Sequence, residues 1–194
     1  MEEREMSAEL KSKVANPGPL GLLGFGMTTV LLNLHNAGLL PLSIAIVAMG
    51  IALGGLAQII AGLRELCQGN TFAGTAFTAY GLFWWSLVLI WVNPFAEAGI
   101  EAASKVAMGY YLLLWGIFTG FMFIGTLKHN RATQVVFGSL TILFLLLALG
   151  DFTGNHTITI IAGFEGIFCG LSAIYSAMGQ ILNAEYGKEV MPLG

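Results

Sequence analysis

The stretch LSIAIVAMGIALGGLAQIIAGL, residues 42–63, contains no charged side chain and ends just before Arg64. A bilayer has a hydrocarbon core about 30 Å thick, and a helix needs about 20 predominantly apolar residues to cross it. Soluble strands and most buried core helices are shorter than this apolar run. The stretch therefore predicts a transmembrane helix.

Five more apolar runs flank this stretch, at residues 19–36, 72–92, 106–127, 132–149 and 158–182. Only 10% of the 194 residues are charged, whereas soluble domains carry about 25%. The connections between the runs are short and leave no room for a soluble catalytic domain. We expect an all-α integral membrane domain of six transmembrane helices over residues 16–194, preceded by a cytoplasmic tail at residues 1–15.

Lys and Arg are distributed unevenly between the two sides that six spans would define. The side of the two termini would hold seven of them: Arg4, Lys11, Lys13, Arg64, Lys128, Arg131 and Lys188. Only Lys105 would lie on the other side. Because cations near span ends favour the cytoplasm, we expect a multi-pass protein of the cell membrane with both termini cytoplasmic.

Glycine patterns suggest a repeat. The even-numbered spans carry GxxxG pairs, at Gly50 and Gly54, Gly116 and Gly120, and Gly166 and Gly170. Such pairs let helix backbones approach closely in lipid. The odd-numbered spans carry Phe25-Gly26, Tyr80-Gly81 and Phe137-Gly138. The pattern predicts three quasi-repeated helical hairpins around one path, although 26 glycines make chance a partial explanation.

Several function classes are disfavoured. Cys67 and Cys169 are the only cysteines, and neither has metal-ligand spacing around it. The net charge of -3 comes with no basic stripe, so a nucleic acid is not expected as a partner. No span contains a nucleophile with a base or a metal-ligand set, so we expect neither an enzyme nor a bound metal or cofactor.

Polar side chains inside the spans are the remaining candidates. Glu165 is the one acid well inside a predicted span, and it could relay protons or make a packing hydrogen bond. Gln58 and Asn33 could contact a solute or hydrogen-bond a neighbouring helix. Hydroxyls that could line a path belong to Thr28, Thr29, Thr75, Thr78, Thr119 and Thr141. With no Lys or Arg in a span interior, such a path suits a small solute with a methyl end and one carboxyl group.

The first span opens with Asn16-Pro17-Gly18-Pro19-Leu20-Gly21-Leu22. This segment closely resembles the signature of the acetate uptake transporter family, which reads Asn-Pro-Ala-Pro-Leu-Gly-Leu. The similarity continues at residues 69–72, 75–81, 125–128, 139–141 and 173–179, and it extends over residues 15–193.

The resemblance implies a homo-hexamer with a separate path for acetate or a similar monocarboxylate through each protomer. It also implies an apolar constriction made by Phe25, Tyr80 and Leu140. Succinate as a second substrate stays open, as does the choice between a channel and proton-coupled transport. A channel for a small neutral solute such as urea or a short amide is the alternative, because it too needs no fixed charge.

The segment from Asn16 to Leu22 allows two interpretations. Pro17 and Pro19 cannot continue a helix backward, so the first helix starts abruptly. Its free amide groups and the Asn16 side chain would then favour a carboxylate at the inner mouth. Alternatively, Asn16 only caps the helix.

Overall fold

The computed structural model describes residues 14–194, so Arg4, Lys11 and Lys13 of the expected tail lie outside the described residues. The described chain is helical and contains no strand. Its long segments are α2 (Gly18–Asn36), α5 (Thr71–Val92), α6 (Lys105–Thr126), α7 (Arg131–Thr153) and α8 (His156–Tyr186). The second span consists of α3 (Ile44–Met49), the π-helix η1 (Gly50–Ala57) and α4 (Gln58–Cys67), and a short 3-10 helix, η2 (Ala96–Ala98), lies between α5 and α6.

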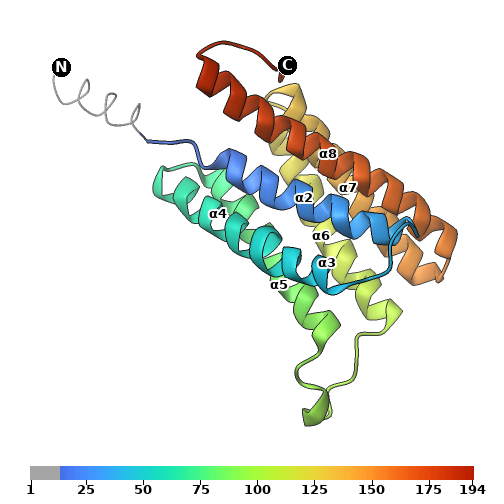
Figure 1. The fold of residues 1–194 in the computed structure, drawn as a ribbon. Coiled ribbons are helices and arrows are strands. Elements are labelled where there is room, and N and C mark those ends of the chain that lie inside the picture. Colours follow the sequence, from blue (N-terminus) through green and yellow to red (C-terminus); the bar gives the residue numbers. More distant parts are fainter. Residues whose placement is uncertain (1–13) are drawn as a thin grey trace.

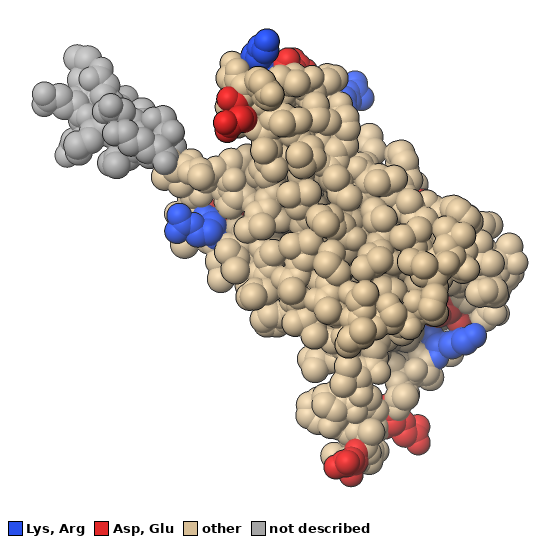
Figure 2. Space-filling model, viewed as in Figure 1, with Lys and Arg blue, Asp and Glu red and all other residues tan. Residues whose placement is uncertain are grey.

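These segments lie side by side as one bundle, with α2 beginning and α8 ending at the same end (Figure 1). Five of them are long and apolar enough to cross a membrane: Ile44–Cys67 and α5 to α8. The remaining segment, α2, is shorter and less apolar, because it contains several glycines and the polar residues Asn33 and His35. Figure 2 shows Lys, Arg, Asp and Glu gathered toward the two ends, with a broad uncharged surface between them. That distribution suits a bundle surrounded by lipid.

Two helices are longer than their apolar runs predicted. The fifth span continues past residue 149 to Thr153, and the sixth runs from His156 to Tyr186 instead of from 158 to 182. A helix ends where its backbone turns away, and here Gly154 (φ 64°) and Gly187 (φ 62°) adopt the left-handed conformation that favours glycine. Hydrophobicity marks the membrane core, so an apolar run ends before the helix does.

The helices α2 and α8 touch along their backbones. A Cβ atom added to Gly170 would lie 2.7 Å from the carbonyl oxygen of Gly26, and one added to Gly166 would collide with the Asn33 side chain. By contrast, a Cβ atom on Gly120 would meet only the Thr141 methyl group, at 3.8 Å. Of the predicted GxxxG pairs, Gly170 therefore lies against the backbone of α2 and Gly166 against the Asn33 side chain, whereas Gly120 makes no close contact.

The π-helix interrupts the second span next to α2 and α5. A π-helix is wider than an α-helix and breaks the regular ladder of backbone hydrogen bonds, and π segments are frequent at functional sites. Here the Trp85 indole donates a hydrogen bond to the carbonyl oxygen of Ile51, at 3.0 Å. The π-helix ends directly before Gln58, whose side chain is fully buried.

Candidate functional site

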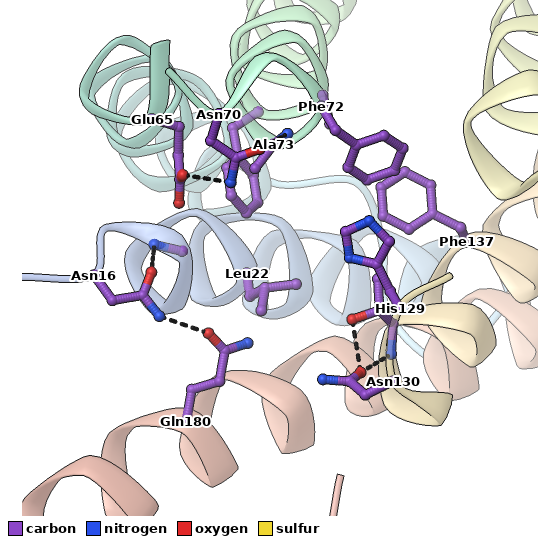
Figure 3. A pocket seen from close by; sticks show the side chains of 14 residues that line it. Asn16, Leu22, Glu65, Asn70, Phe72, Ala73, His129, Asn130, Phe137 and Gln180 are labelled. Carbon is purple, nitrogen blue, oxygen red and sulfur yellow. Dashed lines mark hydrogen bonds between the residues drawn. The ribbon is translucent and has the colours of Figure 1, made fainter. Parts of the chain in front are cut away.

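Four cavities follow one another through the bundle. The first, of about 260 Å³, lies at the start of α2. Its polar lining consists of side chains that come from five different helices or their ends (Figure 3): Asn16, Glu65, Asn70, His129, Asn130, Thr133 and Gln180. It shares Leu22 and Phe137 with the second cavity.

The second and third cavities are small and meet at three residues. Their volumes are about 20 and 30 Å³, whereas one water molecule needs about 10–15 Å³ of such space. Phe25, Tyr80 and Leu140 line both cavities. These side chains thus separate two spaces that hold one or two water molecules each, and acetate does not fit without a movement of side chains.

The fourth cavity continues the series beyond the third, with which it shares Leu32 and Leu147. It has a volume of about 140 Å³, and its polar lining includes Asn36, Asp151 and Thr159. Since Asn36 ends α2 and Thr159 lies in the first turn of α8, this cavity lies at the opposite end of the bundle from the first. The series runs through a single chain.

Tyr80 is held from several sides at the boundary of the second and third cavities. Its hydroxyl group lies 2.9 Å from the Thr119 hydroxyl of α6. Its ring centre lies 6.2 Å from that of Phe25, 5.5 Å from that of Phe118 and 6.2 Å from that of Phe137. Contacts between offset or tilted rings at such separations are favourable. Tyr80 is therefore part of a packed aromatic cluster at this boundary.

Gln58 places an unpaired amide group in the second cavity. Its side chain is fully buried, and neither Nε2 nor Oε1 has a hydrogen-bond partner among the described residues. Phe25, Tyr80 and Leu140 line the same cavity. An unpaired buried polar group costs about 1–3 kcal/mol, so this amide is a candidate for contact with a solute in transit.

The start of α2 uses its amide groups internally. Asn16 Oδ1 accepts a hydrogen bond from the Gly18 amide at 2.9 Å, and Asn16 Nδ2 donates to Gln180 Oε1 at 3.0 Å. The Leu20 and Gly21 amides both donate to the carbonyl oxygen of Pro17. Because Pro19 has no amide hydrogen, no amide of the first turn is free for a substrate. The N-cap residue is Pro17, and Asn16, one residue before it, binds the Gly18 amide. These bonds correct the expectation of free amide groups.

Glu65 is a site residue that the sequence did not reveal. It lies on α4 beyond the predicted end of the second span, yet it is only 5% exposed and lines the first cavity. Asn70 Nδ2 donates to Glu65 Oε2 at 2.8 Å. One signal could have identified it: Gln58, Gly62 and Glu65 follow the i, i+4, i+7 spacing of one helix face.

The polar candidates from the sequence separate into two groups. Thr29 and Asn33 line the third cavity, as Gln58 lines the second. The remaining threonines face other helices, their own backbone or the outside: the Thr28 hydroxyl donates to the carbonyl oxygen of Gly24, Thr78 faces Gly62, Thr141 donates to Phe137 and Thr75 is exposed. Side chains around a helix point in all directions, so composition could not separate these groups.

Glu165 lines none of the four cavities. It is partly buried on α8, and its Oε2 atom has no hydrogen-bond partner among the described residues. One turn further along α8, the Cys169 sulfur lies 3.7 Å from the carbonyl oxygen of Val136, so this side of α8 faces α7. A proton relay, one of the two functions considered for Glu165, would act away from the cavities.

Comparisons with known proteins agree with the sequence resemblance. Residues 3–191 match the model of the GPR1/FUN34/yaaH family. The chain is 56% identical over 184 residues to the "Succinate-acetate/proton symporter SatP" of Escherichia coli K12, covering 94% of this chain and 97% of that protein. It is 33% identical over 198 residues to "Acetate permease A" of Emericella nidulans, covering 93% of this chain and 66% of that protein.

A solved structure is similar over the same extent. The chain resembles the structure described as that of the bacterial acetate channel SatP, with a TM-score of 0.91 and 56% sequence identity. The similarity covers 94% of this chain and 100% of that one.

Proposed function

Because this chain belongs to the GPR1/FUN34/yaaH family of membrane transport proteins, we propose that it moves acetate or a similar short monocarboxylate through its own series of cavities. The observation that carries this proposal is the meeting of the second and third cavities at Phe25, Tyr80 and Leu140. Those three residues are the constriction that the family resemblance implies.

The cavities offer separate surroundings for the two ends of acetate. Apolar rings accept the methyl group, while the carboxyl group needs hydrogen-bond donors when it leaves water. Gln58 Nε2 is such a donor before the constriction, because nothing else in the described chain accepts its hydrogens. Asn33 and Thr29 line the cavity on the other side of Phe25. A carboxylate passing the rings thus exchanges one polar contact for the next.

Passage requires the constriction to widen, since the adjoining cavities are no larger than about 30 Å³. Apolar constrictions exclude water and ions until their side chains move apart. The names of the two relatives differ on mechanism: one is called a proton symporter and the other a channel. For this chain we propose that acetate passes through a gated constriction. Whether its transport is coupled to proton movement is the property to be measured.

The assembly and orientation complete the proposal. The four cavities lie within one chain, which supports one path per protomer of a homo-oligomer, for which the family resemblance implies a hexamer. The close pairing of α8 with α2, α4 with α5 and α6 with α7 joins neighbouring predicted hairpins and supports a threefold arrangement around the path. The hairpins themselves are unequal, because α7 and α8 pack closely whereas α5 and α6 barely touch. Arg64, Lys128, Arg131 and Lys188 lie at the end where α8 finishes, which supports placing that end in the cytoplasm.

The test is the flux of radiolabelled acetate into proteoliposomes that contain the purified oligomer, corrected for flux into protein-free vesicles. Protein-dependent flux that succinate or propionate competes with, but urea does not, supports the proposal. Competition by urea or acetamide with no acetate flux would show a neutral-solute channel instead. Repeating the assay with an inward proton gradient separates coupled accumulation from passive flow.

A further inference from the structure

The direction of the Gln58 side chain depends on the π-helix that precedes it. Gln58 is the first residue after η1, and its buried amide lines the second cavity. Successive residues of an α-helix are turned by about 100° around its axis. A π-helix has wider turns, so it changes the direction in which the residues that follow it point. The hydrogen bonding of η1 therefore affects whether the Gln58 amide faces the cavity.

The backbone of η1 lies close to α2 and α5 at two glycines. A Cβ atom added to Gly24 of α2 would lie 2.6 Å from the carbonyl oxygen of Leu53. One added to Gly81 of α5 would lie 2.8 Å from the carbonyl oxygen of Gly55. Ile51 of η1 instead has an exposed side chain. This part of η1 thus belongs to the outer surface of the bundle, the surface that suits lipid.

Trp85 of α5 bonds to η1 at this outer surface. Its indole Nε1 donates to the carbonyl oxygen of Ile51 at 3.0 Å. A Cβ atom added to Gly55 would collide with the same nitrogen, so the indole occupies the place that a side chain at position 55 would fill. A π-helix breaks the regular ladder of backbone hydrogen bonds, and within lipid no water can compensate for a weakened one. The Trp85 indole supplies a hydrogen bond from the protein itself.

We propose that Trp85 is a positioning residue for transport: its bond to Ile51 holds η1 in the form that keeps the Gln58 amide turned into the second cavity. The inference rests on the proposed function. In the described part of the chain, Trp85 lines none of the four cavities. It therefore acts through Gln58 and not by touching the solute.

The experiment measures acetate flux per folded oligomer in proteoliposomes, for variants made in the native chain and again in Gln58→Leu. Trp85→Phe keeps an aromatic ring and removes the hydrogen-bond donor. Gly55→Ala breaks the same bond from the other side, because the added Cβ atom displaces the indole. Comparing the two backgrounds shows whether these changes act through Gln58.

Tyr175→Phe is the matched control. Tyr175 is 41% exposed and Trp85 is 37% exposed, and the Tyr175 hydroxyl also donates to a backbone carbonyl oxygen, that of Pro192 at 2.8 Å. Tyr175 lies on α8 and lines none of the four cavities among the residues described. The control therefore removes the same kind of bond at a place that does not orient Gln58.

In the native chain, Trp85→Phe and Gly55→Ala should each lower acetate flux about two- to tenfold, the equivalent of one neutral hydrogen bond. Tyr175→Phe should keep the native flux. In Gln58→Leu, neither Trp85→Phe nor Gly55→Ala should lower the flux further, because the amide that they misplace is already absent. Hydrogen–deuterium exchange of residues 50–57 should be faster in Trp85→Phe than in the native protein and unchanged in Tyr175→Phe.

Several results would overturn the inference and leave acetate transport intact. Equal losses of flux in both backgrounds, or loss of assembly in both Trp85→Phe and Gly55→Ala, would mean that Trp85 only supports the fold. Native flux or native exchange in Trp85→Phe would show that its bond does not hold η1, and native flux in Gln58→Leu would leave Trp85 nothing to position. Absence of acetate flux in the native protein would overturn the proposed function and the inference together.

Discussion

The Tyr80 hydroxyl group lies 2.9 Å from the Thr119 hydroxyl group and ties the constriction to α6. Thr119 donates its own hydrogen to the carbonyl oxygen of Trp115, at 2.7 Å. Tyr80 is therefore the donor in the bond between the two hydroxyl groups. This bond fixes how far the Tyr80 ring reaches between the second and third cavities, so the separation of these cavities depends on a residue that lines neither of them.

Replacing Thr119 with valine should destabilise the protein and loosen the constriction. The substitution keeps the shape but leaves the Tyr80 hydroxyl without its partner in a buried site, at a cost of about 1–3 kcal/mol. Thermal unfolding in detergent should show a lower Tm, and downhill acetate flux should rise. Thr141→Val is the control, since Thr141 bonds only within its own helix. Equal losses of stability in both variants would argue against a special function for the Tyr80 bond.

Removing the ring of Phe25 should speed acetate flux while lowering stability. Phe25 is 6% exposed and lines both constriction cavities. Phe-to-Ala substitutions in packed sites cost about 3–5 kcal/mol, yet the path becomes wider. We expect a several-fold increase in protein-dependent flux. Leu140→Ala tests the same idea with a smaller loss, and a decrease of flux per folded oligomer in both variants would contradict a gate made of these side chains.

Gln58→Leu should change stability and transport in opposite directions. Leucine has a similar size and removes a buried amide that has no partner, so the free energy of unfolding should stay equal or increase by about 1 kcal/mol. The carboxyl group of the solute loses a donor worth about 1.5–3 kcal/mol, and flux should fall at least about tenfold. Flux measurements beside thermal unfolding check both effects. Native flux in a stable Gln58→Leu protein would exclude Gln58 as a substrate contact.

Alanine at Gly170 should disturb the α2–α8 contact. Its Cβ atom would lie 2.7 Å from the carbonyl oxygen of Gly26, and this backbone cannot move away without separating the helices. We expect a loss of about 1–3 kcal/mol from overpacking. Gly120→Ala is the matched control, because its Cβ atom meets only a methyl group at 3.8 Å. A larger loss of stability in Gly170→Ala than in Gly120→Ala would show that the helix contact determines the cost of the substitution. Equal losses in the two unfolding curves would point to the GxxxG spacing alone.

Much of the architecture could be predicted from composition. The predicted spans all correspond to helical segments, because a long, predominantly apolar stretch is stable in the membrane core only when its backbone is hydrogen-bonded internally, as in a helix. The family resemblance is confirmed by the family model and by the relatives. Helix ends were less predictable: Asn155 caps α8 before the apolar residues begin, and Gly187 ends the helix well after they stop.

The site was only partly predictable. Phe25, Tyr80 and Leu140 came from the resemblance, and the structure brings them together at the boundary of two cavities. Glu65 was missed because it lies past the apolar run, where an acid normally meets water. Glu165 attracted attention because it lies inside such a run, yet it lines no part of the path.

The sequence by itself determined that this chain is a multi-pass membrane protein and to which family it belongs, because the cost of moving residues from water into lipid depends on composition along the chain. Only the tertiary structure decided which polar side chains face the cavities. That choice depends on how each helix is rotated against its neighbours, and the rotation is fixed by close contacts such as those of Gly26 with Gly170 and of Gly24 with Leu53. Those contacts turn Gln58 and Glu65 inward, and they turn Glu165 toward a neighbouring helix instead.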